Sequence, residues 1–356
     1  MALLDKVFKA AVDFKASDVH ISPGEPFIVR QFGKLRKFKG EQLSAARCKQ
    51  LIVELLNEKQ QKTLMDDLQL DFAYEIAGLG RFRGSAMMHR IGLSASFRIV
   101  PPTIPSFADL GLPDIVEKAL DNHQGLILVT GATGHGKSTT LAAMVDYINT
   151  NRAHHVLTVE DPIEFIHPLK KGAINQRELG TGTLSYANAL RGALRQDPDV
   201  IMIGELRDLE TVSLAISAAE TGHLVIGTLA TSSAPKTVDR IIDSFPPGEQ
   251  NQVRAMLAEA IKAVITQRLI PGADGKKMHL ALEILVGTLP MANLIREGKT
   301  FQIPSMMQTG KNVGMKIMDE SILELLQAGT ITANDAMLSA ANPSRFKPFV
   351  EKEQQQ

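Results

Sequence analysis

The sequence contains a single cysteine, Cys48, among its 356 residues. With one thiol, neither a disulfide bond nor a zinc site built from several cysteines can form within the chain. An excess of charge of either sign is also missing, because 39 Lys and Arg face 39 Asp and Glu. This balance excludes the broad positive field expected of a protein that binds nucleic acid over its whole surface, while a local basic patch stays compatible with it.

Long apolar runs are absent as well. No stretch of the sequence approaches the roughly 18 apolar residues that suggest a membrane span. The first residues differ from a secretory signal peptide, because Asp5 and Lys6 interrupt the apolar run early. There is no internal repeat and no low-complexity segment. Without a predicted membrane span or signal peptide, we expect a cytoplasmic protein. Since the chain is longer than one ordinary domain, we expect two domains.

A proline-rich segment marks the expected domain boundary. Three prolines fall within residues 101–105, and proline has no backbone N–H to donate to a helix or a strand ladder. We therefore predict an N-terminal domain at residues 1–100 and a linker at residues 101–106. The second domain is predicted at residues 107–356, with a helical segment from about residue 319.

Before this boundary, helical and strand patterns are mixed. Apolar residues from Leu4 to Phe14 repeat at helical spacing, whereas later segments alternate with a period of two residues. The further predicted elements are strands at Asp18–Ile21 and Phe27–Phe32, a helix near Ala45–Leu56, and strands between Leu70 and Val100. This pattern predicts a small α+β domain whose sheet has one solvated face and one face covered by helices.

After the boundary, the predicted strands are almost continuously apolar and alternate with helical segments. They are Gly125–Thr130, His155–Val159, Val200–Ile203 and His223–Thr228. Such strands indicate a parallel sheet that is covered on both faces. Near the end of the chain we expect a helix from Ser321 to stop at Gly329, and Thr332 to cap the next helix.

Residues 131–138 match the G-x-x-x-x-G-K-[ST] pattern of a phosphate-binding loop. The loop follows an apolar strand and precedes a predicted helix at Ser138–Ile148, which is the context that the pattern requires. Its glycines let backbone N–H groups turn towards phosphate oxygens, Lys137 adds a positive charge, and the Ser138 hydroxyl can bind Mg²⁺. We therefore predict a nucleoside triphosphate site made of Gly131, Ala132, Thr133, Gly134, His135, Gly136, Lys137, Ser138 and Thr139.

Two glutamates end neighbouring predicted strands. Glu160 follows the strand from His155, and Glu205 follows the strand from Val200. In a parallel sheet, both strand ends open on the same edge as the phosphate loop. We assign Glu205 to the metal shell through a water molecule, and Glu160 to orienting or deprotonating the attacking water, with Asp161 as the alternative for that role. Each carboxylate is also compatible with a helix cap or an ion pair.

Three arginines and one histidine are further candidates. Arg81 and Arg83 are two residues apart and share one strand face, and Arg98, like them, lies opposite an aromatic neighbour. These arginines are either solvated or reach a nucleotide bound by a neighbouring subunit, where an arginine stabilises the transition state. His223 precedes an apolar strand and is either structural or a sensor that hydrogen-bonds the γ-phosphate.

In this order and context, the motifs resemble the secretion ATPase superfamily, and within it the PilT/PilU-type retraction motors of type IV pili. The resemblance runs nearly from end to end. Its segments, beside the phosphate loop, are Ala16–Ile21, Thr158–Phe165, Asp199–Asp208, Ala219–Leu224 and Asn293–Glu297.

The resemblance implies an α/β protein with a PAS-like N-terminal domain and a RecA-like ATPase domain, whose sheet is mostly parallel and is followed by C-terminal helices. It implies a homo-hexameric ring, with ATP and Mg²⁺ as cofactors, that lies in the cytoplasm at the inner membrane. Rotation between domains would power pilus retraction and twitching motility. The implied partners are the inner-membrane platform protein of the pilus and, as an optional partner, a second retraction ATPase. Nucleic acid is not among the implied partners.

The resemblance also assigns roles to single residues. Glu160 corresponds to the catalytic glutamate, Glu205 to the Walker B position, and His223 to the histidine box of the family. Arginines at the positions of Arg81, Arg83 and Arg98 belong to the region that completes the site of a neighbouring subunit.

The sequence departs from the family pattern at two positions. Ala230 stands where the family usually has a second histidine, and Ala292 stands where the retraction motif usually has an arginine. These departures favour an alternative function, that of an accessory nucleotide-binding ring subunit with weak hydrolysis that supports another retraction ATPase. An extension or export ATPase of the same superfamily, which typically carries a four-cysteine metal site, is disfavoured by the single cysteine. A DNA-translocating motor is disfavoured by the neutral charge.

Overall fold

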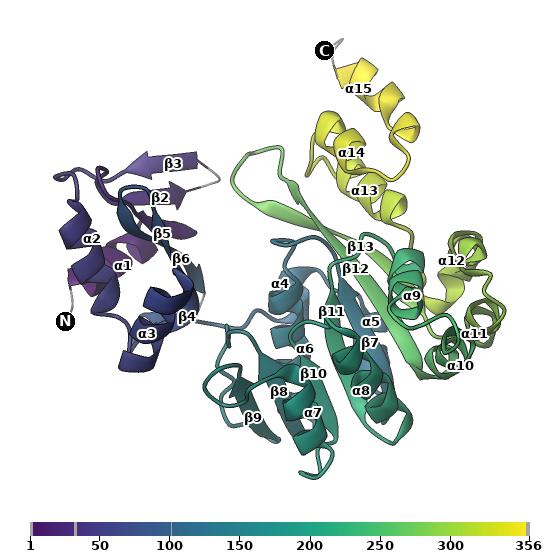
Figure 1. The fold of residues 1–356 in the computed structure, drawn as a ribbon. Coiled ribbons are helices and arrows are strands. Elements are labelled where there is room, and N and C mark those ends of the chain that lie inside the picture. Colours follow the sequence, from purple (N-terminus) through teal and green to yellow (C-terminus); the bar gives the residue numbers. More distant parts are fainter. Residues whose placement is uncertain (1–2, 32–33, 101, 354–356) are drawn as a thin grey trace. The chain divides into compact units, whose positions relative to one another are not determined.

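The computed structural model of the chain describes residues 3–31, 34–100 and 102–353 (Figure 1). Outside these residues lie Phe32 of a predicted strand, Pro101 of the predicted linker, and the outer ends of the two predicted domains at residues 1–2 and 354–356. Within the described part of the chain, no helix combines the length and the apolar character that crossing a membrane requires.

The chain divides into two compact units. The first comprises Met1–Thr103 together with Pro162–Ile166, and the second comprises Ile104–Asp161 and His167–Gln356. The main division thus falls within the segment that the sequence indicates as a linker. The short segment at residues 162–166, which belongs to the first unit although it lies far along the chain, was not predicted.

The first unit contains a six-stranded antiparallel sheet in the order β3-β2-β1-β6-β5-β4. Its strands are β1 (Asp18–Ile21), β2 (Ile28–Gln31), β3 (Lys34–Lys37), β4 (Gln69–Ile76), β5 (Gly80–His89) and β6 (Gly92–Val100). Its helices are α1 (Leu3–Asp13), α2 (Ala45–Val53) and α3 (Glu58–Asp67). This arrangement confirms the α+β fold that the sequence predicts for the N-terminal domain.

Helix α3 and strand β3 were not predicted. The helix expected to run to Leu56 ends at Val53, and α3 begins at Glu58 because Asn57 caps it. The Asn57 side chain accepts from the Gln60 N–H at 2.9 Å, and the Gln60 side chain accepts from the Asn57 N–H at 3.0 Å. Such a reciprocal capping box satisfies two N–H groups that otherwise lack a partner at the start of a helix.

Phe8 of α1 forms the centre of the core of this unit. Its ring stacks on Phe82 of β5 at a centroid distance of 4.4 Å and meets the edge of Phe97 of β6 at 4.9 Å. All three side chains are fully buried. The core therefore fixes helix α1 on the sheet through aromatic contacts between segments that are far apart in the sequence.

We expect Phe8→Ala to lower the free energy of unfolding by about 3–5 kcal/mol, because it removes a buried aromatic ring and leaves a cavity among rigid neighbours. Leu35→Ala is the matched control, since the Leu35 side chain on β3 is 57% exposed and its loss should cost less than about 0.5 kcal/mol. Urea denaturation of both variants measures the difference, and equal unfolding midpoints would contradict this view of the core.

The second unit contains a seven-stranded sheet in the order β13-β12-β7-β11-β10-β8-β9. Its strands are β7 (Gly125–Thr130), β8 (His155–Glu160), β9 (Ala173–Glu178), β10 (Val200–Ile203), β11 (Leu224–Leu229), β12 (Ile261–Pro271) and β13 (Met278–Val286). All neighbouring pairs are parallel except β12 and β13, which form an antiparallel hairpin. The parallel core was predicted, whereas β9 and the hairpin were not.

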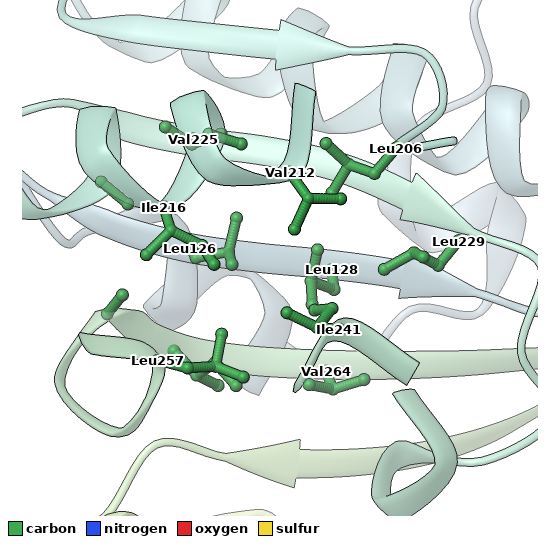
Figure 2. Close-up of a cluster of buried hydrophobic side chains, with 14 of the residues drawn as sticks. Leu126, Leu128, Leu206, Val212, Ile216, Val225, Leu229, Ile241, Leu257 and Val264 are labelled. Carbon is green, nitrogen blue, oxygen red and sulfur yellow. The ribbon is translucent and has the colours of Figure 1, made fainter. Parts of the chain in front are cut away.

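Helices cover both faces of this sheet, as predicted. Alternate residues of β7 point to opposite faces, so Leu126 and Leu128 pack in one hydrophobic cluster and Ile127 and Val129 in the other. The first cluster contains residues from α7 (Tyr186–Ala193), α8 (Leu209–Glu220), α9 (Ala234–Asp243), α10 (Gln250–Ala260), α11 (Leu289–Arg296) and α12 (Ile303–Thr309). Figure 2 shows part of it, including Leu126 and Leu128. The second contains residues from α4 (Phe107–Leu110), α5 (Asp114–Leu120) and α6 (Lys137–Asn151).

The C-terminal helices α13 (Met318–Gln327), α14 (Ala333–Ser339) and α15 (Lys347–Glu353) follow at the end of the chain (Figure 1). Ile270 of β12 and Ala281 of β13 share a hydrophobic cluster with residues of this helical segment. As predicted, Thr332 caps α14, because its hydroxyl accepts from the Asp335 N–H at 3.0 Å. Three short 3₁₀ turns, η1 (Thr300–Gln302), η2 (Gly310–Val313) and η3 (Pro343–Arg345), complete this part of the chain.

Candidate active site

The predicted phosphate loop connects strand β7 to helix α6. Gly131 adopts φ +141°, and a Cβ at this position would lie 2.6 Å from the carbonyl oxygen of Gln267, so only glycine fits here. Gly136 is the N-cap of α6, which begins at Lys137, one residue before the predicted start. The N-terminal N–H groups of a helix have no partner within the helix and favour a bound anion. The loop therefore has the geometry of a phosphate site.

Lys137 lies over the loop. Its Nζ donates to the carbonyl oxygens of Gly131 at 2.9 Å and Ala132 at 3.1 Å. Partial burial lowers the pKa of the Lys137 ammonium, and the negative charge of Glu205 opposes this shift. The only side-chain cation within the loop motif is thus held at the loop and within electrostatic reach of the carboxylate assigned to the metal.

Glu160 is the last residue of β8 and is buried. Its Oε1 accepts from the Thr158 hydroxyl at 2.7 Å and from the Gln176 amide of β9 at 3.1 Å. Next to it, the ends of β8 and β10 approach so closely that a Cβ at Gly204 would lie 3.4 Å from the Glu160 Cα. Glu160 is therefore oriented by its neighbours on two strands and lies next to the segment that carries Glu205.

Glu205 and Asp161 share one cation, Arg207. The Arg207 Nε donates to Glu205 Oε2 at 2.7 Å, and its Nη1 lies 3.7 Å from Asp161 Oδ2. The hydrogen bond to Glu205 raises the pKa of the Arg207 guanidinium. Tyr186 of α7 is buried beside these groups, and burial followed by the charge of Asp161 raises the pKa of its phenol.

The site therefore includes residues that the sequence reasoning missed, namely Arg207, Gln176 and Tyr186. For Arg207 a signal was available, because it stands two residues after Glu205 in the same motif. Gln176 and Tyr186 carried none, because their place beside the acids depends on β9 and α7, which only the folded chain brings to this edge.

The phosphate loop, Glu160 and Glu205 meet at one edge of the sheet. β7, β8 and β10 are parallel members of it, and each of these features stands at or after the carboxyl end of its strand. Mg²⁺ is usually held by one or two carboxylates together with substrate phosphates and water. The oxygen donors of Ser138 and Glu205 fit this ion, which would supply charge neutralisation at the phosphates.

His223 does not join this edge. It immediately precedes β11, whose first residue, Leu224, pairs with Gly125 at the start of β7. A strand of six residues spans about 20 Å. His223 stands at the amino ends of the parallel strands, whereas the phosphate loop stands at their carboxyl ends, about one strand length away. Its Nδ1 lies 3.1 Å from the carbonyl oxygen of Ala218, at the end of α8. The position of His223 therefore favours the structural one of its two predicted roles, whereas Ala230, which follows β11, does stand at the loop edge.

The three candidate arginines all lie in the first unit. Arg83 of β5 pairs in register with Arg98 of β6. The exposed fraction of their side chains ranges from 16% for Arg81 to 58% for Arg98. Arg81 is therefore not the fully solvated arginine that one of the two alternatives predicts. Each arginine forms an ion pair within its own unit, and the pairs are Arg81–Glu75 at 3.5 Å, Arg83–Glu164 at 3.5 Å and Arg98–Asp18 at 3.2 Å.

Comparison with known proteins identifies the family of this chain. The family model described as Type II/IV secretion system protein matches residues 1–338. The type IV pilus retraction ATPase PilT of Pseudomonas aeruginosa is 46% identical over 331 residues, which cover 93% of this chain and 96% of PilT. The type IV pilus ATPase PilU of the same organism is 37% identical, covering 97% of this chain and 91% of PilU.

Among solved structures, the pilus retraction motor PilT with bound ADP superimposes with a TM-score of 0.88. It is 43% identical to this chain, and the match covers 97% of this chain and 98% of that one. The likeness thus extends over both units and confirms the predicted fold class. The chain belongs to the family of Type II/IV secretion system proteins.

Proposed function

We propose that this chain is an ATPase that powers the retraction of type IV pili and thereby twitching motility. The observation that carries the proposal is the shared edge of the second unit, where Lys137 of the phosphate loop lies within electrostatic reach of Glu205, beside the buried Glu160. The identity of 46% to PilT over nearly the whole chain supports the same activity.

In this mechanism, the N–H groups of the loop and Lys137 hold the phosphates of ATP. Glu160, oriented by Thr158 and Gln176, positions the attacking water and accepts its proton. Glu205 would hold the water shell of a bound Mg²⁺, which would supply charge neutralisation at the phosphates.

The assembly forms part of the same proposal. We infer a homo-hexameric ring in the cytoplasm at the inner membrane, which acts on the platform protein of the pilus and works with a second retraction ATPase where one is present. The first unit is the PAS-like domain and the second the RecA-like domain, with boundaries near residues 100 and 107. Within the ring, one or more of Arg81, Arg83 and Arg98 reach the nucleotide of a neighbouring subunit.

Ala230 favours a second candidate function. It stands at the loop edge of β11 and is exposed, and alanine offers no side-chain hydrogen bond to a phosphate. A chain that lost such a contact is suited to bind ATP, join a ring and hydrolyse little, as an accessory subunit does. Ala292, half-buried in α11, is the second departure that fits this function.

Steady-state ATP hydrolysis at rising protein concentration separates the two functions. For the motor, the rate per subunit should increase as rings assemble, and Arg83→Ala should lower the rate of the assembled ring about 10³-fold or more if Arg83 acts in trans. Arg90→Ala, an exposed arginine beyond the other end of β5, is the matched control. The same assay on Arg81→Ala and Arg98→Ala shows which arginine acts. A rate that stays near zero despite assembly and bound ATP would instead support the accessory subunit.

A further inference from the structure

Strand β12 holds the phosphate loop at several points that the proposed catalytic roles do not use. Before the loop, the hydroxyls of Thr130 and Thr266 lie 2.9 Å apart. After it, the Gln267 amide donates to the Thr140 hydroxyl at 2.7 Å. Both contacts are buried. They fix the two ends of the loop and leave its middle, residues 132–134, exposed.

His135 makes the contact nearest to the middle of the loop. Its Nδ1 accepts from the backbone N–H of Leu269, which stands three residues after Thr266 on β12, at 2.8 Å. Because the partner is a backbone amide, which can only donate, Nδ1 must be without a proton when this bond forms. The contact therefore requires a neutral imidazole with its proton on Nε2.

The charges around His135 favour that neutral form. Partial burial lowers the pKa of the imidazole, and Arg268 of β12 and Lys137 of α6 lower it further through their positive charges. Arg268 itself is held in place by a hydrogen bond to the carbonyl oxygen of Ser339. Geometry and charge thus select the same state of His135.

We propose that His135 is a positioning residue that holds the phosphate loop in its binding shape by accepting the Leu269 N–H, and that protonation of the imidazole releases the loop. The inference rests on the proposed function, because it concerns how tightly this loop holds nucleotide. Its consequence is a nucleotide affinity that falls when the cytoplasm becomes acidic.

Other titratable groups share the surroundings of His135. A cavity of about 1290 Å³ adjoins the start of α6, and His135 forms part of its wall. The ionisable groups in that wall come from the α4–α5 region, the β12–β13 hairpin and the η2–α13 region, and are Asp109, Asp114, Lys118, Lys277, His279, Lys311, Lys316, Glu320 and Glu324. Of these, His279 is the other histidine in the wall beside His135 and therefore needs its own control.

The test measures the affinity of the full-length protein for a fluorescent ADP between pH 5.5 and 8. In His135→Asn, the side-chain Oδ1 takes the place of Nδ1 and can accept the same N–H at every pH, whereas His135→Ala removes the acceptor. At pH 8 we expect affinity near that of the wild type for His135→Asn and a loss of about tenfold for His135→Ala. The pKa of His135 lies below the ordinary histidine pKa of 6.5, so the acid-dependent loss of affinity should begin below pH 6.5. Only proteins that keep His135 should show this loss, and His279→Gln should therefore show it too.

Titration of the phosphates of ADP affects all variants equally, so the difference between the wild type and His135→Asn isolates the histidine. The proposal is overturned if His135→Ala binds as the wild type does at pH 8, or if His135→Asn loses affinity in acid as steeply as the wild type. Failure of the wild type to bind ADP at any pH would overturn the proposed function as well. Binding that is intact and indifferent to His135 would overturn this inference alone.

Discussion

Replacing Lys137 by alanine is expected to weaken nucleotide binding about 100-fold or more and to abolish hydrolysis. The Nζ of Lys137 already lies at the loop through its bonds to the carbonyl oxygens of Gly131 and Ala132. No other lysine or arginine stands in the loop motif to replace its charge. Hydrogen bonds to charged groups contribute about 1.5–3 kcal/mol each, and the ammonium makes more than one contact with phosphate oxygens in such loops.

Isothermal titration with ATP in the presence of Mg²⁺ measures this loss. Lys171→Ala is the matched control, because Lys171 is an exposed lysine of the same unit, outside the loop motif. The control should bind ATP as the wild type does. Binding by Lys137→Ala within about threefold of the wild type would contradict the assignment of residues 131–139 as the nucleotide site, since the expected loss is much larger.

The second large effect is expected at the two glutamates, whose variants should bind ATP but lose turnover. Glu160→Gln keeps the size of the side chain and an oxygen that can accept from Thr158, yet an amide cannot take a proton from water. We expect a loss of about 10²–10⁴-fold in kcat, the usual contribution of a general base. The trapped ATP should also stabilise the assembled ring.

Glu205→Ala removes the carboxylate assigned to the metal shell and leaves Arg207 with Asp161 as its remaining acidic partner. Because the loop and Lys137 are unchanged, ATP should still bind, while kcat should fall by about 10²-fold or more. The Mg²⁺ concentration needed for half-maximal rate should rise in this variant and stay unchanged in Glu160→Gln.

Parallel measurements of ATP binding and steady-state hydrolysis check both glutamates. Glu249→Gln, an exposed glutamate at the start of α10, provides the control. Should both Glu160→Gln and Glu205→Ala hydrolyse ATP at the wild-type rate, the catalytic assignment would be wrong. Should both fail to bind ATP, their roles would be structural and not catalytic.

His223 belongs to one of the family motifs but stands at the edge of the sheet opposite the phosphate loop. The phosphate loop follows β7, whereas His223 precedes β11, and parallel neighbours have all their carboxyl ends on one edge. The order of residue and strand in the sequence already contained this distinction. Applied strictly, the argument that places Glu160 and Glu205 at the loop edge excludes His223 from it and includes Ala230.

The missed strands have a different cause. β12 carries Lys262 and the polar run Thr266–Arg268 among its apolar residues and, at 11 residues, is long for a strand. Its pattern therefore does not stand out as the short apolar runs of β7 and β10 do. β9 has a mostly polar sequence, since it lies at the edge of the sheet. Edge and hairpin strands are chosen by their partners more than by their own composition.

The sequence by itself determined the phosphate loop, the parallel core and the family, because these features are written in short runs of consecutive residues with their own turn chemistry and periodicity. Only the tertiary structure decided which side chains serve the loop. His135 and Leu269 are 134 positions apart, and they meet because β12 pairs with β7. Arg207 likewise joins Glu205 to Asp161 through the pairing of β10 with β8. Contacts of this kind depend on strand order, which no local pattern specifies.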